Sequence, residues 1–274
     1  MWIDEGRCRL CLVSSRTSDL IKLNEVNVLP QALRIIAKML EEEKNTRDEI
    51  FVETFNGIKR LINNEDPYES LKRDLNKLGQ ELSIELRKVL EENQWNLELA
   101  MKFSASANII DTSVLGYEPK ELREAIWDQP VKFGEVALPS KDTTIYFILD
   151  NSGEAYVDLL FIEALKKSKY DVKTVIREKS YEIDVTPKEF KADIITPSNY
   201  SPVKYIRDGF IIAKGIANLE AYISLENSPP ALLLFRTKCD VLSMKFRVRK
   251  NTPIIAEGYY AKKLLSTKSF NKPS

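Results

Sequence analysis

The sequence contains no histidine, and this absence removes a large part of the usual catalytic repertoire. Without an imidazole there can be no Ser-His-Asp or Cys-His machinery and no metal ion ligated by histidine. A general base must therefore be Asp, Glu, Lys, Tyr, Cys or a metal-bound water. A bound metal ion must be held by oxygen or thiolate ligands.

Cysteine and glycine are also scarce, with three Cys and nine Gly in 274 residues. Three cysteines cannot build the disulfide framework of a small secreted domain. The motifs G-x-x-x-x-G-K-[ST], G-x-G-x-x-G and G-x-S-x-G are all absent. Nucleoside-triphosphate binding, dinucleotide binding and serine-hydrolase chemistry therefore lose their usual sequence support.

The chain has no excess of charge of either sign, because 41 Lys and Arg balance 41 Asp and Glu. No global field therefore favours nucleic acid or an acidic membrane as a partner. No apolar stretch approaches the roughly 18 residues of a membrane span. The first five residues do not show the basic-then-apolar order of a signal peptide. We expect a cytoplasmic protein that binds neither nucleic acid nor membrane.

The two halves of the sequence differ in their hydrophobic pattern. In the first half, apolar residues recur near helical spacing over 17–43, 46–62 and 68–93. The second half alternates a helical pattern with short apolar runs, at 145–149, 172–176, 210–213, 231–235 and 252–256. This alternation predicts an α/β fold in which helices cover both faces of a mostly parallel sheet. We expect a helical part over 1–140 and an α/β part over 141–274, joined in one compact unit.

Polar clusters follow several of these predicted strands. Asp150-Asn151-Ser152-Gly153-Glu154 comes after the first strand, Lys214-Gly215 after the third, and Asp184 lies a few residues beyond the second. Ligands of open α/β sheets bind beyond the carboxyl ends of the strands, so these clusters are candidates for one site.

The cluster after the first strand has the composition of a cation and anion site. Asp150 and Asn151 offer hard oxygen ligands suited to Mg²⁺ or Mn²⁺. Ser152 and Gly153 open the next helix, where backbone N–H groups and the helix dipole would face an anion. The same residue types also suit an ordinary strand-to-helix turn, and Asp184 also suits a plain loop.

Other candidates are weaker taken singly. Asn108 and Asp111 can share a helical face, or they can end one helix and cap the next. Lys214 is a candidate phosphate clamp with Asn218 four residues on, although most lysines are simply solvated.

The N-terminal region carries Cys8-Arg-Leu-Cys11, a C-x-x-C pair. One such pair is half of a zinc site, and Cys239 is the remaining cysteine that can add a ligand. A structural metal on Cys8, Cys11 and Cys239, a redox pair and no special role all remain open.

Taken together, the motifs resemble the damage-control phosphatase family with the ARMT-like metal-binding fold, formerly domain-of-unknown-function family eighty-nine, in its archaeal-type branch with an N-terminal C-x-x-C. Ala107 and Ile183 stand where that family usually has Gly and Asn. The similar segments, in chain order, are Cys8-x-x-Cys11; Asp66-Pro67-Tyr68 with Lys72 and Asn76; Ala107-Asn108-x-x-Asp111; Asp150-Asn151-Ser152-Gly153-Glu154 with Asp158; Asp184-Val185-Thr186; Asp208 to Gly215 with Asn218 and Glu220; and Lys238-Cys239.

The resemblance implies a Rossmann-like three-layer α/β/α sandwich with a helical N-terminal subdomain. It implies a divalent metal (Mg, Mn, Co or Ni) held by Asp150, Asn151 and Asp184, with Asp150 and Lys214 catalytic. It also implies a small phosphorylated metabolite, such as a sugar phosphate, as the ligand. The implied substrate and phosphate contacts are Asn108, Asp111, Ser152, Gly153, Glu154, Lys214, Gly215 and Asn218.

We therefore expect a metal-dependent phosphomonoester hydrolase. A metal-bound water and the Asp150 carboxylate are both compatible with the role of nucleophile. Two other functions are considered beside it. One is an S-adenosylmethionine-dependent carboxyl methyltransferase, and the other is a non-catalytic, metal-stabilised interaction module built on the C-x-x-C pair and the helical half.

Overall fold

The computed structural model describes residues 2–42, 46–109 and 121–266. Helices come first along the chain, as the hydrophobic pattern predicted. Their bounds are α1 (Glu5–Lys22), α2 (Leu29–Glu41), α3 (Arg47–Leu61), α4 (Glu69–Glu92), α5 (Leu97–Ser106) and α6 (Leu122–Ala125), with the 3-10 turn η1 (Val26–Val28) before α2. The pattern over 17–43 thus covers two helices, because α1 ends at Lys22.

The rest of the described chain alternates strands and helices. The strands are β1 (Val131–Phe133), β2 (Ile145–Ile148), β3 (Val172–Arg177), β4 (Ile194–Thr196), β5 (Phe210–Lys214), β6 (Ala231–Arg236) and β7 (Pro253–Glu257). The helices are α7 (Glu154–Lys167), η2 (Pro202–Tyr205), α8 (Gly215–Ser224), α9 (Asp240–Phe246) and α10 (Gly258–Ser266). None of the helices in the described parts of the chain is long and apolar enough to cross a membrane.

The strands form one sheet in the order β1-β7-β6-β5-β2-β3-β4. Strands β4, β3, β2, β5 and β6 are parallel, and β7 then pairs antiparallel with β6. The predicted α/β class with a mostly parallel sheet is therefore confirmed. Sequence patterning missed β1 and β4, which have three residues each and lie at the two edges of the sheet. Strand β1 joins this sheet although it precedes residue 141.

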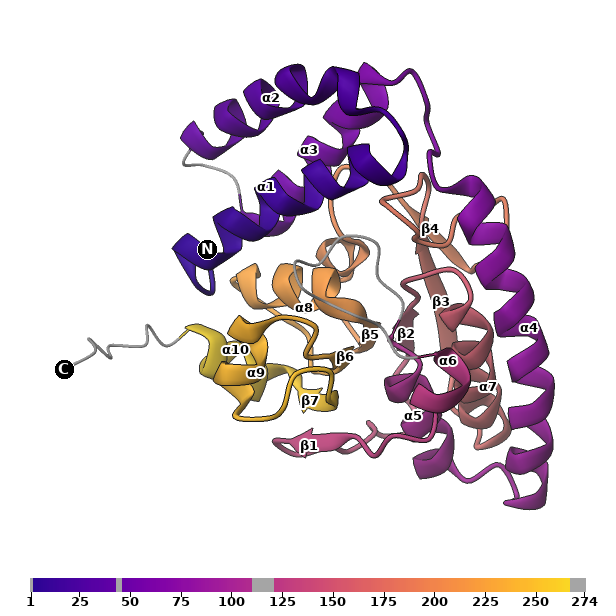
Figure 1. Ribbon diagram of the computed structural model, residues 1–274. Coiled ribbons are helices and arrows are strands. Elements are labelled where there is room, and N and C mark those ends of the chain that lie inside the picture. The colour runs from indigo at the N-terminus through magenta and orange to yellow at the C-terminus, as the bar shows by residue number, and fades with distance from the viewer. Residues whose placement is uncertain (1, 43–45, 110–120, 267–274) are drawn as a thin grey trace.

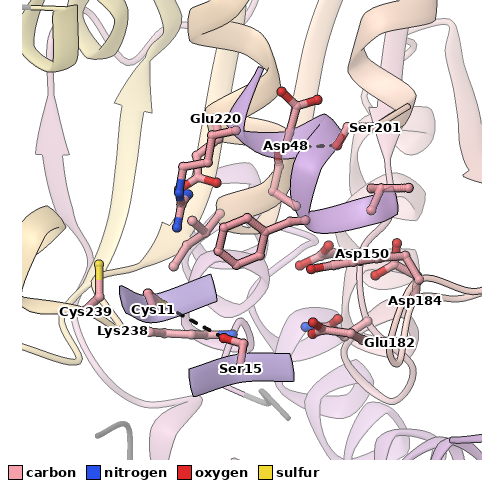
Figure 2. A pocket seen from close by; sticks show the side chains of 17 residues that line it. Cys11, Ser15, Asp48, Asp150, Glu182, Asp184, Ser201, Glu220, Lys238 and Cys239 are labelled. Atoms are coloured by element: carbon pink, nitrogen blue, oxygen red, sulfur yellow. Dashed lines mark hydrogen bonds and ion pairs between the residues drawn. The ribbon is translucent and has the colours of Figure 1, made fainter. Parts of the chain in front are cut away.

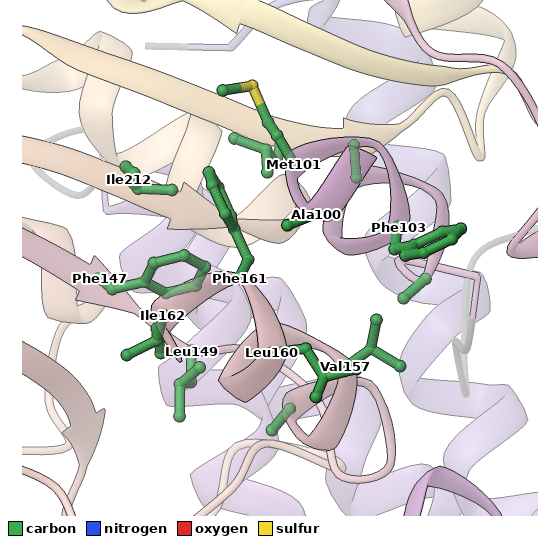
Figure 3. Close-up of a cluster of buried hydrophobic side chains, with 14 of the residues drawn as sticks. Ala100, Met101, Phe103, Phe147, Leu149, Val157, Leu160, Phe161, Ile162 and Ile212 are labelled. Atoms are coloured by element: carbon green, nitrogen blue, oxygen red, sulfur yellow. The ribbon is translucent and has the colours of Figure 1, made fainter. Parts of the chain in front are cut away.

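Helices cover both faces of the sheet (Figure 1). Alternate residues of each central strand face opposite layers. In β2, Ile145 and Phe147 pack on the side of α5 and α7, whereas Ile148 packs on the side of α8 and α10. Figure 3 shows the first of these layers, where side chains of β2 and β5 meet those of α5 and α7. The Phe147 and Phe161 rings lie edge to face with centroids 5.7 Å apart.

Helices α1, α2 and α3 form a separate bundle above α8 (Figure 1). Small apolar clusters hold them together, one of them made by Leu12, Ile36 and Ile50. Because α3 packs on α8, the bundle covers the carboxyl edge of the parallel strands. It leaves a pocket between the bundle and the sheet.

Candidate active site

The pocket lies between two walls of different origin (Figure 2). One wall consists of residues that follow β2, β3 and β6, and we call it the strand-end wall. It is formed by Asp150, Asn151, Tyr181, Glu182, Asp184, Lys238 and Cys239. The other wall, which we call the helical wall, comes from α1, α3, α8 and the start of η2. It is formed by Cys11, Ser15, Arg47, Asp48, Phe51, Val52, Ser201, Ile216, Ala217 and Glu220.

Backbone pairing brings Asp150, Asn151 and Asp184 together. Asn151 and Asp184 form an isolated antiparallel bridge. On either side of it, the Val185 amide donates to the Asp150 carbonyl at 2.9 Å, and the Ser152 amide donates to the Ile183 carbonyl at 2.9 Å. The loop after β3 is thereby fixed against the loop after β2, so two carboxylates and one amide share one edge of the pocket.

Both carboxylates of this edge are buried, and burial shifts their ionisation. Desolvation raises the pKa of Asp150 to about 6, while Lys238 and Lys214 act in the opposite direction. Desolvation also raises the pKa of Asp184 well above its usual value, and the neighbouring Asp150 adds to this rise. Arg177, the last residue of β3, opposes the rise at Asp184 through an ion pair with Nε 2.6 Å from Oδ2.

Gly215 allows Asp150 to sit directly against the start of α8. Its φ is +82°, and a Cβ at this position would lie 1.8 Å from Oδ2 of Asp150. The left-handed backbone and the lack of a side chain are thus both required here. Gly215, a predicted site residue, therefore contributes by leaving room for the Asp150 carboxylate.

Asn108 holds the Asp150 carboxylate by a hydrogen bond. Its Nδ2 donates to Asp150 Oδ2 at 3.2 Å and to Glu154 Oε2 at 2.8 Å. Glu154 is fully buried, and desolvation raises its pKa to about 7 against the lowering effects of Lys238 and Lys214. Within the described residues, the buried Oδ1 of Asn108 has no hydrogen-bond partner.

Lys214 lies inside the protein rather than on the pocket wall. Its Nζ donates to Asp158 Oδ1 at 2.7 Å and to the Ser104 carbonyl at 2.5 Å. The Ser104 hydroxyl also donates to Asp158 Oδ1 at 2.6 Å. These contacts tie β5 to α5 and α7. The placement gives no support to the prediction that Lys214 contacts phosphate. Asn218, whose Nδ2 donates to the Lys214 carbonyl at 2.9 Å, is also buried outside the pocket lining.

The backbone amides of Ser152 and Gly153 are used within the protein. The Ser152 amide donates to Ile183, as described above. The Gly153 amide donates to Asn76 Oδ1 of α4 at 2.9 Å. Gly153 has φ +81°, and α7 begins one residue later. The predicted anion contact through these two amides is therefore not supported by their hydrogen bonds.

Two cations of this edge were not singled out as site residues from the sequence. Arg177 ends β3, and Lys238 follows the last residue of β6 by two positions. Both follow the strand-end rule that had pointed to Asp150, so the signal was present. In Figure 2, Lys238 extends from the side of Cys239 toward the carboxylates. Its charge lowers the pKa of Asp150 more than any other neighbouring charge does.

The chain was then compared with known proteins. The model of the damage-control phosphatase ARMT1-like domain matches residues 6–201. The chain belongs to the damage-control phosphatase ARMT1-like family. A damage-control phosphatase of Pyrococcus horikoshii is 25% identical over 263 residues, which cover 82% of this chain and 88% of that protein.

One further sequence relative and one solved structure, the latter of the Pyrococcus horikoshii protein named above, are also similar to this chain. An uncharacterised protein of Methanocaldococcus jannaschii is 24% identical over 246 residues, which cover 76% of this chain and 81% of that protein. The crystal structure of a DUF89 family protein from Pyrococcus horikoshii has the same fold. Its TM-score is 0.69 at 20% identity, and the match covers 92% of this chain and 98% of that one.

The donors of the strand-end wall fit a hard divalent cation. The described residues contain no group of three His, Cys, Asp or Glu side chains arranged to hold a metal. Here, however, the third donor would be the amide oxygen of Asn151, beside the carboxylates of Asp150 and Asp184. Two adjacent buried carboxylates with raised pKa values favour a cation that would neutralise them. Their oxygen donors match Mg²⁺ or Mn²⁺.

Two cysteines lie at the end of the pocket away from Asp150 and Asp184 (Figure 2). Cys11 and Cys239 line it, and Cys8 is buried nearby in α1. Cys8 and Cys11 help to raise the pKa of Cys239, whose burial is the main cause of that rise. A structural metal on these thiols stays a prediction. Asp111, the remaining predicted site residue, lies outside the described residues.

Proposed function

We propose that this member of the damage-control phosphatase family is a metal-dependent phosphatase of small phosphorylated metabolites, with sugar phosphates as its substrate class. The observation that carries the proposal is the strand-end wall. Two buried carboxylates, an amide and a lysine converge there at the carboxyl ends of β2, β3 and β6. A cytoplasmic location is part of the same proposal.

Asp150, Asn151 and Asp184 would hold the divalent ion. Such an ion supplies positive charge to the phosphoryl oxygens. Asn108 and Gly215 fix the Asp150 carboxylate, the first by hydrogen bonding and the second by leaving room for it. Arg177 orients Asp184 from the end of β3.

Lys238 takes the role that the sequence suggested for Lys214. It lines the pocket, whereas Lys214 is fully buried against Asp158. A lysine beside the reacting phosphoryl group neutralises negative charge that a phosphate ester carries throughout its hydrolysis. Lys214 instead supports the site by locking β5 to α5 and α7.

The proposed reaction is the hydrolysis of a phosphate monoester. The ester P–O bond breaks, the oxygen of water ends on phosphorus, and the leaving alcohol receives a proton. Either the water attacks directly or the Asp150 carboxylate attacks first and water releases the phosphate from it. The fixed position of Asp150 at the pocket edge supports both routes.

Phosphate release from a panel of sugar phosphates tests the proposal. The protein is treated with chelator and then given Mg²⁺, Mn²⁺, Co²⁺ or Ni²⁺ singly. Asp150→Ala is assayed beside the native chain, with Glu53→Gln on the outer side of α3 as the matched control. We expect metal-restored release that Asp150→Ala loses by more than about 10³-fold and that Glu53→Gln keeps. Circular dichroism establishes that each variant is folded.

Absence of release with every metal, from folded protein, would overturn the proposal. The methyltransferase and the interaction module would then be the functions to test. Calorimetry with S-adenosylmethionine addresses the first of them. Zinc binding by Cys8→Ser and Cys11→Ser variants addresses the second.

A further inference from the structure

The helical wall contains a buried ion pair opposite the proposed metal ligands. Arg47, the first residue of α3, pairs with Glu220 of α8. Both side chains are 9% exposed, and both residues line the pocket. Figure 2 shows Glu220 across the pocket from Asp150 and Asp184. This pair therefore faces the part of a substrate that is not bound at the strand-end wall.

The position of the Arg47 guanidinium is fixed by the elements around it. The guanidinium carbon lies 4.6 Å from the centre of the Phe51 ring, one turn along α3. Lys204 of η2 secures the start of the same helix, with Nζ at 2.9 Å from Thr46 Oγ1, Asp48 Oδ2 and Glu49 Oε1. Rigid placement matters because a fixed charge discriminates between ligands better than a mobile one.

The charges of the helical wall are matched in sign by neighbouring side chains. Arg47 is balanced by Glu220, and Asp48 is balanced by Lys204. The hydroxyls of Ser15 and Ser201 add polar groups without net charge. Such a surface offers hydrogen-bond partners to hydroxyl groups. A second phosphate or carboxylate would meet the carboxylates of Glu220 and Asp48, with no positive charge in excess.

We infer that the Arg47–Glu220 pair sets substrate specificity by selecting monophosphates with a neutral, hydroxyl-bearing remainder against substrates with a second anionic group. This inference rests on the proposed phosphatase function and adds to it a substrate class. Glu220 acts by cancelling a positive charge that would otherwise attract a second anion. Removing its charge therefore changes specificity in a predictable direction.

The test compares glucose 6-phosphate with glucose 1,6-bisphosphate at saturating Mn²⁺. The measured quantity is the ratio of kcat/KM for the two substrates. The native chain favours the monophosphate. Glu220→Gln keeps the side-chain shape and leaves Arg47 unbalanced, so it shifts the ratio toward the bisphosphate by about tenfold. Adding Arg47→Met to that variant returns the ratio to the native value.

Glu53→Gln is the matched control, because it removes the partner of Arg60 in an exposed pair of the same helix. It leaves the ratio unchanged. If Glu220→Gln does not fold, Arg47→Gln replaces it. That variant leaves Glu220 unbalanced and moves the ratio further toward the monophosphate. A uniform loss with both substrates, or an unchanged ratio, would overturn the inference while the phosphatase function stands. If the native chain released phosphate from neither substrate, the proposed phosphatase function itself would be overturned.

Discussion

The two walls of the pocket differ in how their charges are arranged. On the helical wall each charged group has a partner of opposite sign, as with Arg47 and Glu220. On the strand-end wall, Asp184 is paired with Arg177, but it is also buried beside Asp150, whose charge adds to the rise in the pKa of Asp184. The helical wall needs no added charge, whereas the proposed metal ion would neutralise the two carboxylates of the strand-end wall. The first is suited to recognition and the second to chemistry.

The two lysines at the ends of β5 and β6 also differ in their surroundings. Lys214 is fully buried and paired with Asp158, so it serves the fold. Lys238 lines the pocket beside Asp150. We therefore propose different roles for two lysines at neighbouring strand ends, and substitution can separate those roles.

The largest effects come from replacing these lysines one at a time. Lys238→Met lowers kcat for phosphate release by about 10² to 10³-fold because it removes a charge beside the phosphoryl group. Because Lys238 is 2% exposed and its charge favours the ionised forms of Asp150 and Glu154, some loss of stability accompanies the fall in kcat, and we expect it to be smaller than that of Lys214→Met. Lys214→Met leaves Asp158 buried without its cation and lowers the free energy of unfolding by about 3 to 5 kcal/mol. Steady-state kinetics measures kcat and urea unfolding measures the free energy of unfolding, each on both variants. If Lys214→Met instead lost kcat and Lys238→Met instead lost stability, Lys214 would be the lysine that contacts phosphate.

Gly215→Ala tests how closely the strand-end wall is built. A Cβ would overlap Asp150 Oδ2 at a φ of +82°. We expect a loss of about 2 to 4 kcal/mol in unfolding free energy, together with weaker metal binding. Thermal melts with and without Mn²⁺ report both effects. Gly6→Ala is the control, because a Cβ there meets no atom within 4 Å.

The raised pKa values predict how the metal-free protein responds to pH. A carboxyl group with a folded pKa above its unfolded value stabilises the fold at low pH, and this contribution is lost as pH rises through the folded pKa. Asp150 and Glu154, whose pKa values rise from 3.8 to about 6 and from 4.5 to about 7, place that loss between about pH 4 and pH 7.

Metal binding should reverse this trend, because carboxylates ligate in their ionised form. The increase in melting temperature on adding Mn²⁺ is therefore larger at pH 8 than at pH 5.5. Scanning fluorimetry across this range measures it, with Asp150→Asn as the variant that loses the increase. An equal increase in melting temperature at both pH values would show that the metal ion does not bind at these carboxylates.

The smallest effect is expected on the helical wall. Lys204→Met removes the cation that holds Asp48 and Glu49 at the start of α3. Because Asp48 is buried, we expect a loss of about 1 to 3 kcal/mol in stability and a rise of about threefold in KM, with kcat unchanged. Steady-state kinetics separates the two parameters. A fall in kcat would instead show that the position of α3 affects the chemical step and not only substrate binding.

The alternation of apolar runs with helical patterns predicted the class of fold. The rule that ligands bind beyond the carboxyl ends of the strands predicted that Asp150, Asn151 and Asp184 lie at one edge, but the rule left the lysines undecided. It did not distinguish Lys214 from Lys238, because the rule gives the edge of the sheet and not the direction of a side chain. Phe210 and Ile212 face α5 and α7, so Lys214, two residues further along β5, faces the same layer. That alternation is visible in the sequence, but the identity of the covering helices is not.

The helical wall was beyond sequence reasoning for a related reason. Arg47 and Glu220 look like ordinary charged residues of amphipathic helices. Their pairing depends on how α3 packs on α8, which is a tertiary contact between segments far apart in the chain. Likewise, the short edge strands β1 and β4 carry too few residues for a periodic signal.

Helix α4 touches the loop of the active site through two glycines. A Cβ on Gly79 would lie 2.1 Å from the Gly153 carbonyl oxygen, and a Cβ on Gly153 would lie 2.6 Å from the Leu75 carbonyl oxygen. Neither position accepts a side chain while the other segment stays in place. In an evolving lineage, the outer helix and the catalytic loop must therefore be inherited together. A graft of this loop into another scaffold would have to bring α4 with it.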